Sequence, residues 1–366
     1  MYRLHLLGRY LSLFSLWFLA INSIGQTRPL IWDIEEINTM KANPYGEECR
    51  TVFSIANYAI QQAPLSVTQK KNSISGDKHN YESLGCYFWP DPDNPTGPYI
   101  AKDGLINPEY KEYDYPTLME MHKRCINVAK AFYLMPNEMK YYEWFCRQID
   151  AWFINEDTRM YPNFDYCQFC KNKNGNRGNA CGLIDSRLLT DINESVRTVN
   201  GIRPIGKARL KAYKKWMSDF GIWMTKSENG KMASTFTNNQ GIVYDTTLSD
   251  IYILNGKMKK ARKVLERCGA RIEQQIDGEG RQPEELVRSR AYYYSIYNLS
   301  HIIDFISLAN SINIELPRVT TKAKHATEYL LKFVGNRNSF PYQEIDEWGS
   351  LEKMLEKERR RILPEK

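Results

Sequence analysis

The sequence predicts an all-α protein. Apolar residues recur at the 3.6-residue spacing of a helix in one segment after another, as at Leu118, Met121 and Cys125. Helix starts follow one another roughly every 20 to 45 residues, which fits paired helices around a ring, although no clean repeat accompanies the spacing. The predicted helices cover about 46–62, 118–132, 137–154, 183–199, 206–226, 241–255, 257–276, 290–311, 321–335 and 343–361.

The first residues are typical of a secretory signal peptide. Arg3 and Arg9 precede an apolar run that ends at Ile21, and the small residue Gly25 follows. The run is about a dozen residues, short of the roughly 20 that a spanning helix needs, so a retained membrane anchor is the weaker alternative. We expect a signal peptide at 1–25, a single domain at 26–366, and a secreted or periplasmic protein that has no membrane contact after cleavage.

The charge of the chain is modestly positive. Lys and Arg outnumber Asp and Glu by 50 to 43, and two of the arginines belong to the leader. Such an excess suits an acidic substrate, and it is also compatible with no electrostatic role. The basic C-terminal run EKMLEKERRRILPEK has no groove-reading or aromatic companion, so we interpret it as a solvated helix face and expect no nucleic-acid binding.

All eight cysteines follow the leader. In an oxidising compartment an even number favours disulfides, so we expect a local disulfide among Cys167, Cys170 and Cys181, with free thiols as the next alternative. A zinc site ranks third because a fourth ligand is missing. Asp91 to Asn94 could bind calcium, but Asp-Pro steps form turns, and we prefer the turn. We therefore expect no metal and no cofactor.

Two irregular segments interrupt the helical rhythm, at 63–114 and 155–181. Loops of this length inside a compact domain are uncommon, and when ordered they usually form a functional lid or groove wall. Both segments are rich in Tyr, Trp, Asn and Asp, which stack on sugar faces and hydrogen-bond hydroxyls. Aromatic side chains can equally anchor long loops, so composition alone is weak evidence for sugar binding.

Two further segments carry candidate chemical groups. Asn238, Asn239 and Gln240 stand just ahead of a predicted helix, where capping alone explains one of the two asparagines. Arg288 and Tyr294 lie six residues apart, which is about 600° of helix rotation, so they share no helix face. Either the helix begins after Arg288, or the arginine reaches from its first turn. A tyrosine cluster at helical spacing is by itself more often core than catalytic.

Together, six ordered blocks resemble the alginate lyase family from about residue 79 to residue 335. The resemblance implies an incomplete (α/α) toroid or barrel with long irregular loops over one end, a substrate groove at that end, and a metal-independent polysaccharide lyase. The blocks are HNYES and YFWPDP within 79–92, PYIAKDGLINPE at 98–109, TRM at 158–160 with YCQ at 166–168, GLID at 182–185, NNQGIVYD at 238–245, and QPEELVR with YSIYNL within 282–299.

The resemblance also implies a role for each matching residue. Asn239 and Arg288 would neutralise the substrate carboxylate, where such preorganised donors can each contribute about 3–4 kcal/mol. Tyr294 would take the C5 proton and return one to the O4 leaving group, and a nearby arginine has the right sign to lower its pKa. If the match to the family pattern is shifted by one residue, Tyr293 takes the place of Tyr294 as the catalytic tyrosine. The expected substrate-binding residues are Gln240, Asn238, Tyr81, Trp89, Gln168, Tyr244, Tyr293 and Asn298.

Gln240 departs from the family pattern, which usually has a histidine there. Glutamine can donate a hydrogen bond but cannot accept a proton at neutral pH. Either His79 supplies an imidazole, as a fourth catalytic residue, or the site uses tyrosine alone. One tyrosine can serve both proton transfers only where H5 and O4 lie on the same side, as in mannuronate and glucuronate. We therefore predict these linkages as substrates and guluronate as a poor one.

Two other functions remain as alternatives. A non-catalytic relative that binds acidic glycans is kept open by Gln240. A glycoside hydrolase on the same toroid would need two flanking carboxylates, for which Asp245, Glu284 and Glu285 are available without forming an evident pair. His122, His301 and His325 lie in predicted helices and are interpreted as core or surface residues. The favoured prediction is a secreted lyase that leaves 4,5-unsaturated uronate ends, and the oligomeric state stays open.

Overall fold

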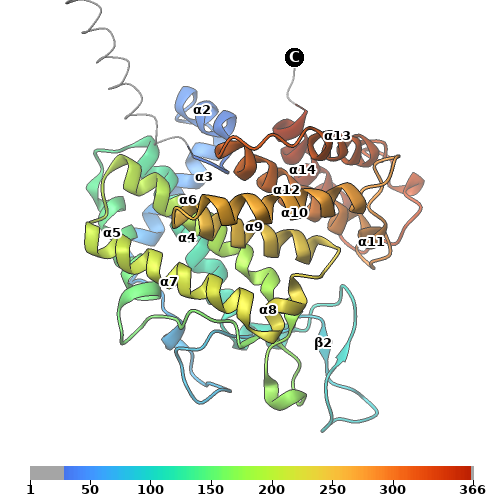
Figure 1. Ribbon diagram of the computed structural model, residues 1–366, viewed down its shortest axis with the longest axis horizontal. Helices are drawn as coiled ribbons and strands as arrows, with labels where there is room; N and C mark the ends of the chain where they lie inside the picture. Colours follow the sequence, from blue (N-terminus) through green and yellow to red (C-terminus); the bar gives the residue numbers. More distant parts are fainter. Residues whose placement is uncertain (1–28, 364–366) are drawn as a thin grey trace, which may run out of the picture.

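The computed structural model describes residues 29–363, and helices dominate this part of the chain (Figure 1). The expected signal peptide lies outside the described residues. None of the described helices is both long and apolar enough to cross a membrane. The α-helices are α2 (Ile34–Ala42), α3 (Glu47–Ile60), α4 (Tyr115–Leu134), α5 (Met139–Ile149), α6 (Arg187–Ile202), α7 (Lys207–Lys226), α8 (Glu228–Ala233), α9 (Asn239–Leu254), α10 (Met258–Gln275), α11 (Pro283–Leu286), α12 (Ala291–Ser311), α13 (Pro317–Leu331) and α14 (Trp348–Ile362).

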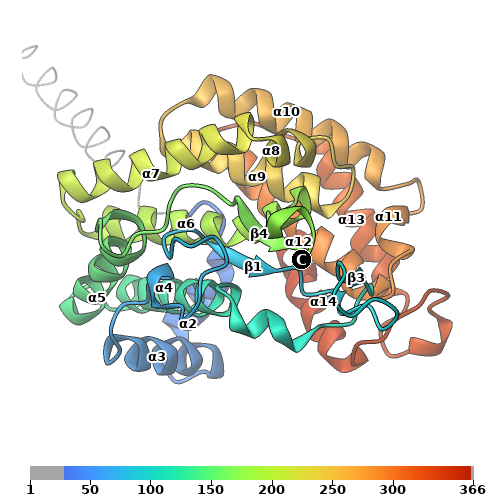
Figure 2. The ribbon, with the colours of Figure 1, turned by 90° about the horizontal axis from the view of Figure 1, so that it is seen from below.

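The helices form an incomplete ring of two layers (Figures 1 and 2). The inner row consists of α4, α6, α9 and α12, which pack side by side in that order. In the outer layer α3 and α5 pack on α4, α7 and α10 pack on α9, and α13 and α14 pack on α12. The predicted all-α class and the incomplete (α/α) toroid are therefore confirmed.

The four inner helices begin at the same end of the ring. Arg187, at the start of α6, donates from Nη2 to Tyr115 Oη at the start of α4 over 2.9 Å. The same guanidinium lies 5.8 Å from the ring of Tyr297, in the second turn of α12. In the first turn of α9, Gln240 hydrogen-bonds Cys181, which precedes α6. Because helix N-termini carry partial positive charge, this end favours anions.

The two irregular segments cover this end (Figure 2). Strand β1 (Glu82–Leu84) pairs in parallel with β4 (Tyr166–Phe169), which joins the two segments to each other. Strand β2 (Phe88–Trp89) pairs antiparallel with β3 (Ile100–Ala101), which folds the longer segment into a hairpin. The prediction that both segments are irregular is correct except for these four short strands and a few 3-10 turns, such as Val67–Gln69 and Pro108–Glu112.

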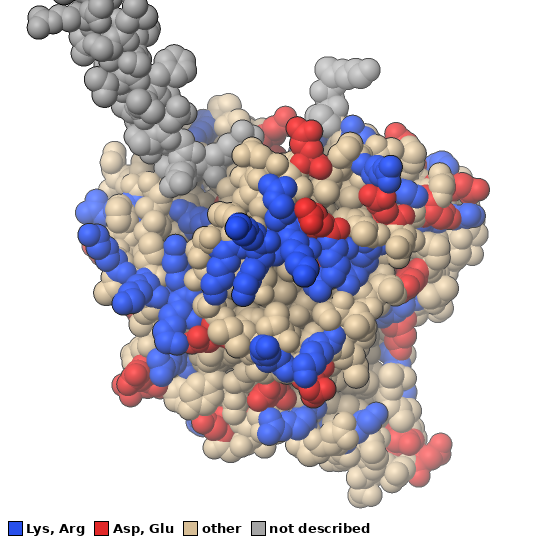
Figure 3. Space-filling model, in the orientation of Figure 1, with Lys and Arg blue, Asp and Glu red and all other residues tan. Residues whose placement is uncertain are grey.

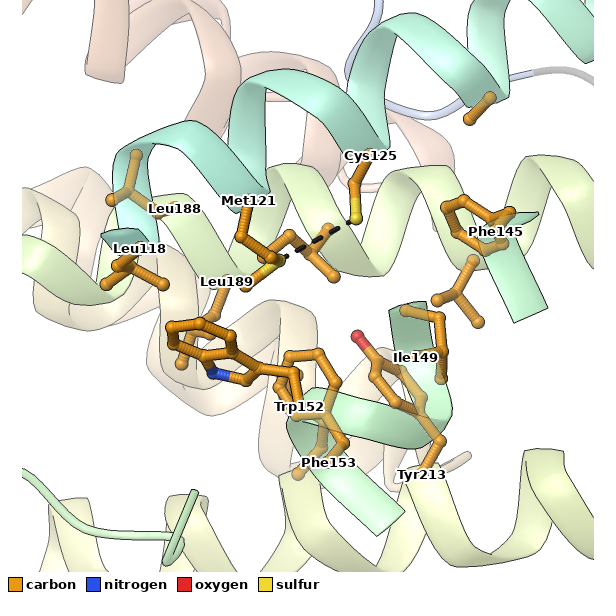
Figure 4. Packing of buried hydrophobic residues seen from close by; sticks show 14 of the residues in the cluster. Leu118, Met121, Cys125, Phe145, Ile149, Trp152, Phe153, Leu188, Leu189 and Tyr213 are labelled. Atoms are coloured by element: carbon orange, nitrogen blue, oxygen red, sulfur yellow. Dashed lines mark hydrogen bonds between the residues drawn. The ribbon is translucent and has the colours of Figure 1, made fainter. Parts of the chain in front are cut away.

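Buried apolar side chains form two clusters. The first lies between α2 and α9 and contains the fully buried Trp144 and Trp152. Figure 4 shows part of it, with Met121 of α4 above the indole of Trp152. The second cluster lies between α9 and α14. Helix α9 joins them, because Leu248 belongs to the first and Ile242 to the second. Burial of each such side chain stabilises the fold by about 1.5–3 kcal/mol.

Most predicted helices are present with slightly different ends. The segment 206–226 is α7 (Lys207–Lys226), whereas 321–335 begins earlier and ends earlier, as α13 (Pro317–Leu331). The segment 137–154 ends in a π-helical turn, Asp150–Ile154. Helices α2, α8 and α11 were not predicted, because helices of so few turns offer too few periodic positions to detect.

The expected disulfide among Cys167, Cys170 and Cys181 is not formed, and all eight cysteines are free thiols. Cys167 Sγ lies 3.0 Å from the Gly182 carbonyl, and Cys170 donates to a different carbonyl, at 3.2 Å. The three sulfur atoms therefore face different partners. In residues 29–363 no cluster of three or more metal-ligand side chains could hold a metal ion.

The amide of Asp93 donates to the Asp91 carboxylate at 3.0 Å, which forms the preferred turn.

The basic C-terminal run is more than a solvated face, which corrects the interpretation from sequence. Leu355 and Glu358 of α14 are buried. Arg361 Nη2 donates to Asp304 at 2.6 Å and to the Ile31 carbonyl at 3.4 Å. One face of α14 therefore packs on α12 and ties the ring to the first described residues. The apolar residues within the basic run already indicated that one face of this helix is buried.

Candidate active site

Asn239, Arg288 and Tyr294, here the Asn-Arg-Tyr group, come together at the covered end of the ring. Asn239 starts α9, Arg288 lies in the turn after α11, and Tyr294 is in the first turn of α12. Helix α12 begins at Ala291, after Arg288, so the offset of a continuous helix does not apply. The Arg288 guanidinium carbon lies 3.9 Å from the centre of the Tyr294 ring. Asn239 binds Glu285, whose carbonyl accepts from the Arg288 amide at 3.2 Å.

The Tyr294 hydroxyl lies beneath the longer irregular segment. Its oxygen is 2.6 Å from Tyr87 Oη, and Arg290 Nη1 donates to Tyr87 Oη at 3.1 Å. Burial and the neighbouring Tyr87 hold the pKa of Tyr294 well above its usual value, while the Arg288 cation opposes this shift. The expectation of a lowered pKa is therefore wrong for the free protein, because burial outweighs the cation.

Asp103 of the 63–114 segment binds Arg288 side-on. Its carboxylate accepts from Nε at 3.2 Å and from Nη2 at 2.5 Å, and the Ser289 amide also donates to it, at 2.9 Å. Burial alone would raise the pKa of Asp103, but these donors lower it to about 2. A Cβ on Gly104 would lie 2.3 Å from Ser289 Oγ, so the close approach requires glycine. The side-on pair leaves the Nη1 hydrogens of Arg288 for another acceptor.

Glu285 orients Asn239 at the start of α9. The Asn239 amide and Nδ2 donate to the two carboxylate oxygens of Glu285 at 2.9 and 2.8 Å. Both residues are buried, and burial raises the pKa of Glu285 to about 7 despite these donors. One side-chain hydrogen of Asn239 remains for another acceptor. Asn238 accepts from the Gln240 amide at 3.1 Å, so its side-chain oxygen forms the cap that the sequence suggested, and the partly exposed side chain remains a candidate contact.

A buried carboxylate, Asp185, organises one wall near the starts of α4 and α6. It accepts from Tyr81 Oη and from Gln168 Nε2, both at 2.9 Å. Burial raises the pKa of Asp185, and Arg187 opposes the shift. Tyr81 is fully buried, so it supports the wall and does not face a ligand, which corrects its expected binding role. Gln168 is partly exposed and remains a candidate contact.

Two further expected binding residues lie in the interior. Tyr244 is 2% exposed and donates to the Met224 carbonyl at 3.0 Å. Asn298 is fully buried and donates to Gln282 at 2.8 Å. The Tyr244 hydroxyl and the Asn298 amide nitrogen are thus bound by protein partners inside the helical layers. Their expected contact with substrate is corrected to a structural role.

Trp89 and Tyr293 keep partly exposed faces. Trp89 donates from Nε1 to the Leu105 carbonyl at 2.8 Å, which fixes its ring on the covering segment. The Arg290 guanidinium lies 4.1 Å from the centre of the Tyr293 ring and is held by Asp346, with Nε donating at 2.7 Å. Aromatic faces beside cations suit acidic sugars.

His79 contacts the shorter irregular segment. Its Nδ1 lies 2.6 Å from the Arg159 carbonyl, and its ring stacks on Tyr161 with centroids 5.1 Å apart. Among the described residues no contact joins His79 to the Asn-Arg-Tyr group. The structure therefore does not bring an imidazole to the place that Gln240 leaves without histidine.

Three residues of the site, Tyr87, Asp103 and Arg290, were missed from the sequence, and a fourth, Glu285, was considered only as a carboxylate for hydrolysis. Tyr87 and Asp103 belong to the blocks that carry the family resemblance, and Glu285 and Arg290 flank Arg288. The blocks were the available signal. A sequence does not show which side chain of a long loop folds back over a site, so their partners became visible only in the structure.

A cavity of about 390 Å³ lies away from the Asn-Arg-Tyr group, between the inner helices and α14. His122, Asp191 and His301 are among its lining residues. His122 Nε2 lies 2.7 Å from Asp191 Oδ2, and burial lowers the pKa of His301 to about 3. Both histidines thus line this cavity as partly buried residues, while His325 is exposed. This cavity is not part of the candidate site.

The carboxylates considered for hydrolysis have other partners. Asp245 is buried in ion pairs with Arg267 and Arg271. Glu284 accepts from a threonine hydroxyl at 2.6 Å, and Glu285 holds Asn239. None of the three forms a free pair that could flank a glycosidic bond.

Amide and guanidinium donors beside a phenol suit elimination next to a carboxylate, and on a helical toroid this chemistry places the protein among the polysaccharide lyases. Within that class the chain belongs to the alginate lyase family, whose family model matches residues 66–340. None of the curated proteins matches the chain.

The chain is similar to solved structures of alginate lyases, and the first of them shows the same fold. The crystal structure of an alginate lyase from Bacteroides ovatus is 29% identical over 91% of each chain, with a TM-score of 0.85. An apo form of an alginate lyase A1-III variant is 13% identical over 85% of this chain and 86% of that chain, with a TM-score of 0.50. Alginate lyase A1-III from Sphingomonas species A1 is 13% identical over 81% of this chain and 80% of that chain, with a TM-score of 0.49.

Proposed function

We propose that the protein cleaves a uronate polymer of the alginate type by β-elimination, with Tyr294 transferring the proton. The observation that carries the proposal is the Arg288 guanidinium, 3.9 Å from the Tyr294 ring centre and linked through Glu285 to the Asn239 amide. A substrate carboxylate would bind the Nη1 hydrogens of Arg288 and the remaining amide hydrogen of Asn239. The similarity to the Bacteroides ovatus alginate lyase supports this substrate class.

The two donors make the C5 proton removable, because they stabilise the negative charge that builds on the carboxylate as the C5–H bond breaks. Tyr294, as a phenolate, takes that proton. The electron pair of the C5–H bond forms the C4=C5 double bond, and the C4–O4 bond breaks. The proton then passes from Tyr294 to the departing O4. The products are an unsaturated uronate end and a chain with a free O4 hydroxyl.

The covering segment has two effects on Tyr294. Tyr294 is only 8% exposed, so the segment that carries Tyr87 and Asp103 has to open before a sugar reaches the hydroxyl. Opening also removes Tyr87, which together with burial holds the pKa of Tyr294 above its usual value, so opening favours the phenolate that the elimination needs.

No histidine within residues 29–363 contacts Tyr294, which supports the preference for linkages with H5 and O4 on the same side. Position 240 is glutamine, and His79 Nδ1 is engaged by the Arg159 carbonyl. One phenol can take H5 and deliver a proton to O4 only from one face of the sugar. Mannuronate and glucuronate linkages meet this condition, and guluronate linkages do not.

The test measures near-ultraviolet absorbance of the unsaturated product with mannuronan, glucuronan, guluronan and a neutral glucan. We expect absorbance from the first two, little from guluronan and none from the glucan. New reducing ends without absorbance would show hydrolysis, and binding without either signal would show a non-catalytic glycan binder. Rapid cleavage of guluronan would overturn the same-side preference while leaving the lyase assignment intact.

We also propose that the chain is exported and cleaved between Gly25 and Gln26. The support is the sequence of the first residues, in which two arginines precede a short apolar run. Native protein would be recovered from the periplasm or medium and its N-terminus sequenced. A mature N-terminus near Gln26 is expected, and intact Met1 in the cytoplasmic fraction would contradict export.

A further inference from the structure

A strongly basic surface lies on the flank of the ring. Between residues 257 and 267, at the start of α10, six side chains are basic and one is acidic; between 207 and 215, at the start of α7, five are basic and none is acidic. Figure 3 shows Lys and Arg gathered across this face, over α10 as oriented in Figure 1. We define the flank patch by six of them, Lys211, Lys215, Lys257, Lys259, Lys260 and Lys263.

The two helices present these charges as one surface. Lys257 Nζ donates to Ser218 Oγ at 3.0 Å, which joins the start of α10 to the middle of α7. Lys215 and Lys211 lie about one and two turns before Ser218 and therefore on the same face of α7. The basic side chains of α7 and α10 therefore form one continuous surface.

Most of these charges lack an acidic partner. Lys215 pairs with Asp219 at 2.6 Å, whereas the other five patch lysines form no ion pair within residues 29–363. Lys259 and Lys260 lie in the first turn of α10, where the helix dipole disfavours positive charge. Neither ion pairing nor helix stability therefore accounts for this concentration of lysines.

The flank patch is remote from the candidate site. Asn239 and Leu254 are the two ends of α9, and a helix rises about 1.5 Å per residue, so about 22 Å separates them. The start of α10 follows directly after Leu254. A ligand on the patch therefore leaves the Asn-Arg-Tyr group free, and a polymer long enough can contact both.

We propose that the flank patch is a second, non-catalytic binding surface for the polyuronate, which it holds through carboxylates of sugars outside the groove. The proposal rests on the proposed function, since the partner is the substrate of the site. Charge complementarity supports a regular polyanion. A chain already held in the groove also has a raised effective concentration at the patch, which favours the substrate over unrelated polyanions.

The test compares two triple variants that remove the same charge. The patch variant is Lys259→Gln, Lys260→Gln and Lys263→Gln. The control variant is Lys123→Gln, Lys324→Gln and Lys353→Gln, three exposed lysines on other helices that form no ion pair within residues 29–363. All six side chains are exposed, so both variants are expected to fold as the wild type does. Retardation in gels that contain polymannuronate measures binding, and absorbance kinetics measure cleavage.

We expect the patch variant to lose retardation and to show a KM for long polymer raised roughly five-fold at unchanged kcat. Kinetics on a tetrasaccharide should stay unchanged, and the control variant should behave as wild type throughout. Equal retardation of both variants would overturn the proposal. So would stronger patch-dependent binding of DNA or anionic vesicles than of polyuronate. If the wild type cleaves no polyuronate, the proposed function fails, and the gel comparison still decides the patch.

Discussion

The Tyr294 hydroxyl serves both proton transfers in the proposed reaction, and its protein partner is Tyr87, 2.6 Å away. Tyr294→Phe should lower kcat/KM by about 10³-fold or more, because general acid and base catalysis are both lost. The fold should be kept, since a partly covered hydroxyl is all that is removed. Absorbance kinetics and thermal unfolding measure the two effects.

Tyr293→Phe is the matched control for this prediction, because Tyr293 is the neighbouring tyrosine and keeps a partly exposed face. A loss below about ten-fold is expected there, since only a contact with the sugar would be altered. If Tyr293→Phe abolishes activity while Tyr294→Phe does not, the assignment of the base has to move by one residue.

Asp103 is expected to be a positioning residue for Arg288. Asp103→Asn keeps the size of the side chain but removes one of the two acceptor oxygens that hold Nε and Nη2. We expect kcat to fall about ten-fold with little change in KM and in thermal stability, because a loosely held guanidinium stabilises the transition state less well. Steady-state kinetics separate the two constants.

Asp93→Asn is a suitable control for Asp103, since Asp93 is an exposed residue of the same segment. It should leave both constants unchanged. A rise in kcat/KM for Asp103→Asn would contradict the positioning role and would mean that Asp103 competes with the substrate for Arg288.

The start of α9 depends on a glycine. A Cβ at Gly241 would lie 2.0 Å from the Phe236 carbonyl oxygen, so the turn before the helix cannot accept alanine without moving. Gly241→Ala should lower the free energy of unfolding by about 1–3 kcal/mol and reduce kcat/KM, because Asn239 shares this turn. Denaturant unfolding and absorbance kinetics check the two effects.

Gly269→Ala provides the comparison within a neighbouring helix. A Cβ there would meet its nearest atoms at ordinary contact distance, 3.5 Å from a leucine methyl. Alanine should therefore be neutral or slightly stabilising in α10. Similar destabilisation by both substitutions would show that the effect at Gly241 comes from helix packing in general.

At the level of elements, the sequence identified the long helices and missed their local environment. Apolar periodicity predicted α7 and α12 because each helix has five or more turns, over which the repeat of apolar residues on one face is easy to detect. The pairing of β1 with β4 joins residues more than 80 positions apart, and no local sequence pattern predicts such a pairing. The same limit explains why Asn239, Arg288 and Tyr294 were found from the family blocks while the partners Tyr87 and Asp103 were not.

For the whole molecule, one buried carboxyl links stability to pH. Burial raises the pKa of Glu285 from its usual 4.5 to about 7. Between these values the folded protein binds the proton more tightly than the unfolded chain. This contribution, at most about 3 kcal/mol, is therefore complete below pH 4.5 and is lost as the pH rises through 7.

Glu285→Gln should flatten this part of the profile, because glutamine resembles the protonated acid at every pH. Relative to wild type, we expect little difference in the unfolding midpoint at pH 4.5 and a higher midpoint of the variant at pH 8. Thermal unfolding of both proteins across this range is the measurement. Parallel profiles would show that Glu285 is not the group responsible.

The ring also imposes an order on the making of the protein. Arg361, two residues from the end of the described chain, binds the Ile31 carbonyl, and Asp346 of the same terminal region holds Arg290 beneath Tyr87. A ribosome makes Asp346 and Arg361 after the groups that they bind, Arg290 and the Ile31 carbonyl. A nascent chain can therefore build its first apolar cluster before either contact forms, and the brace on Arg290 beside the phenol pair is added only afterwards.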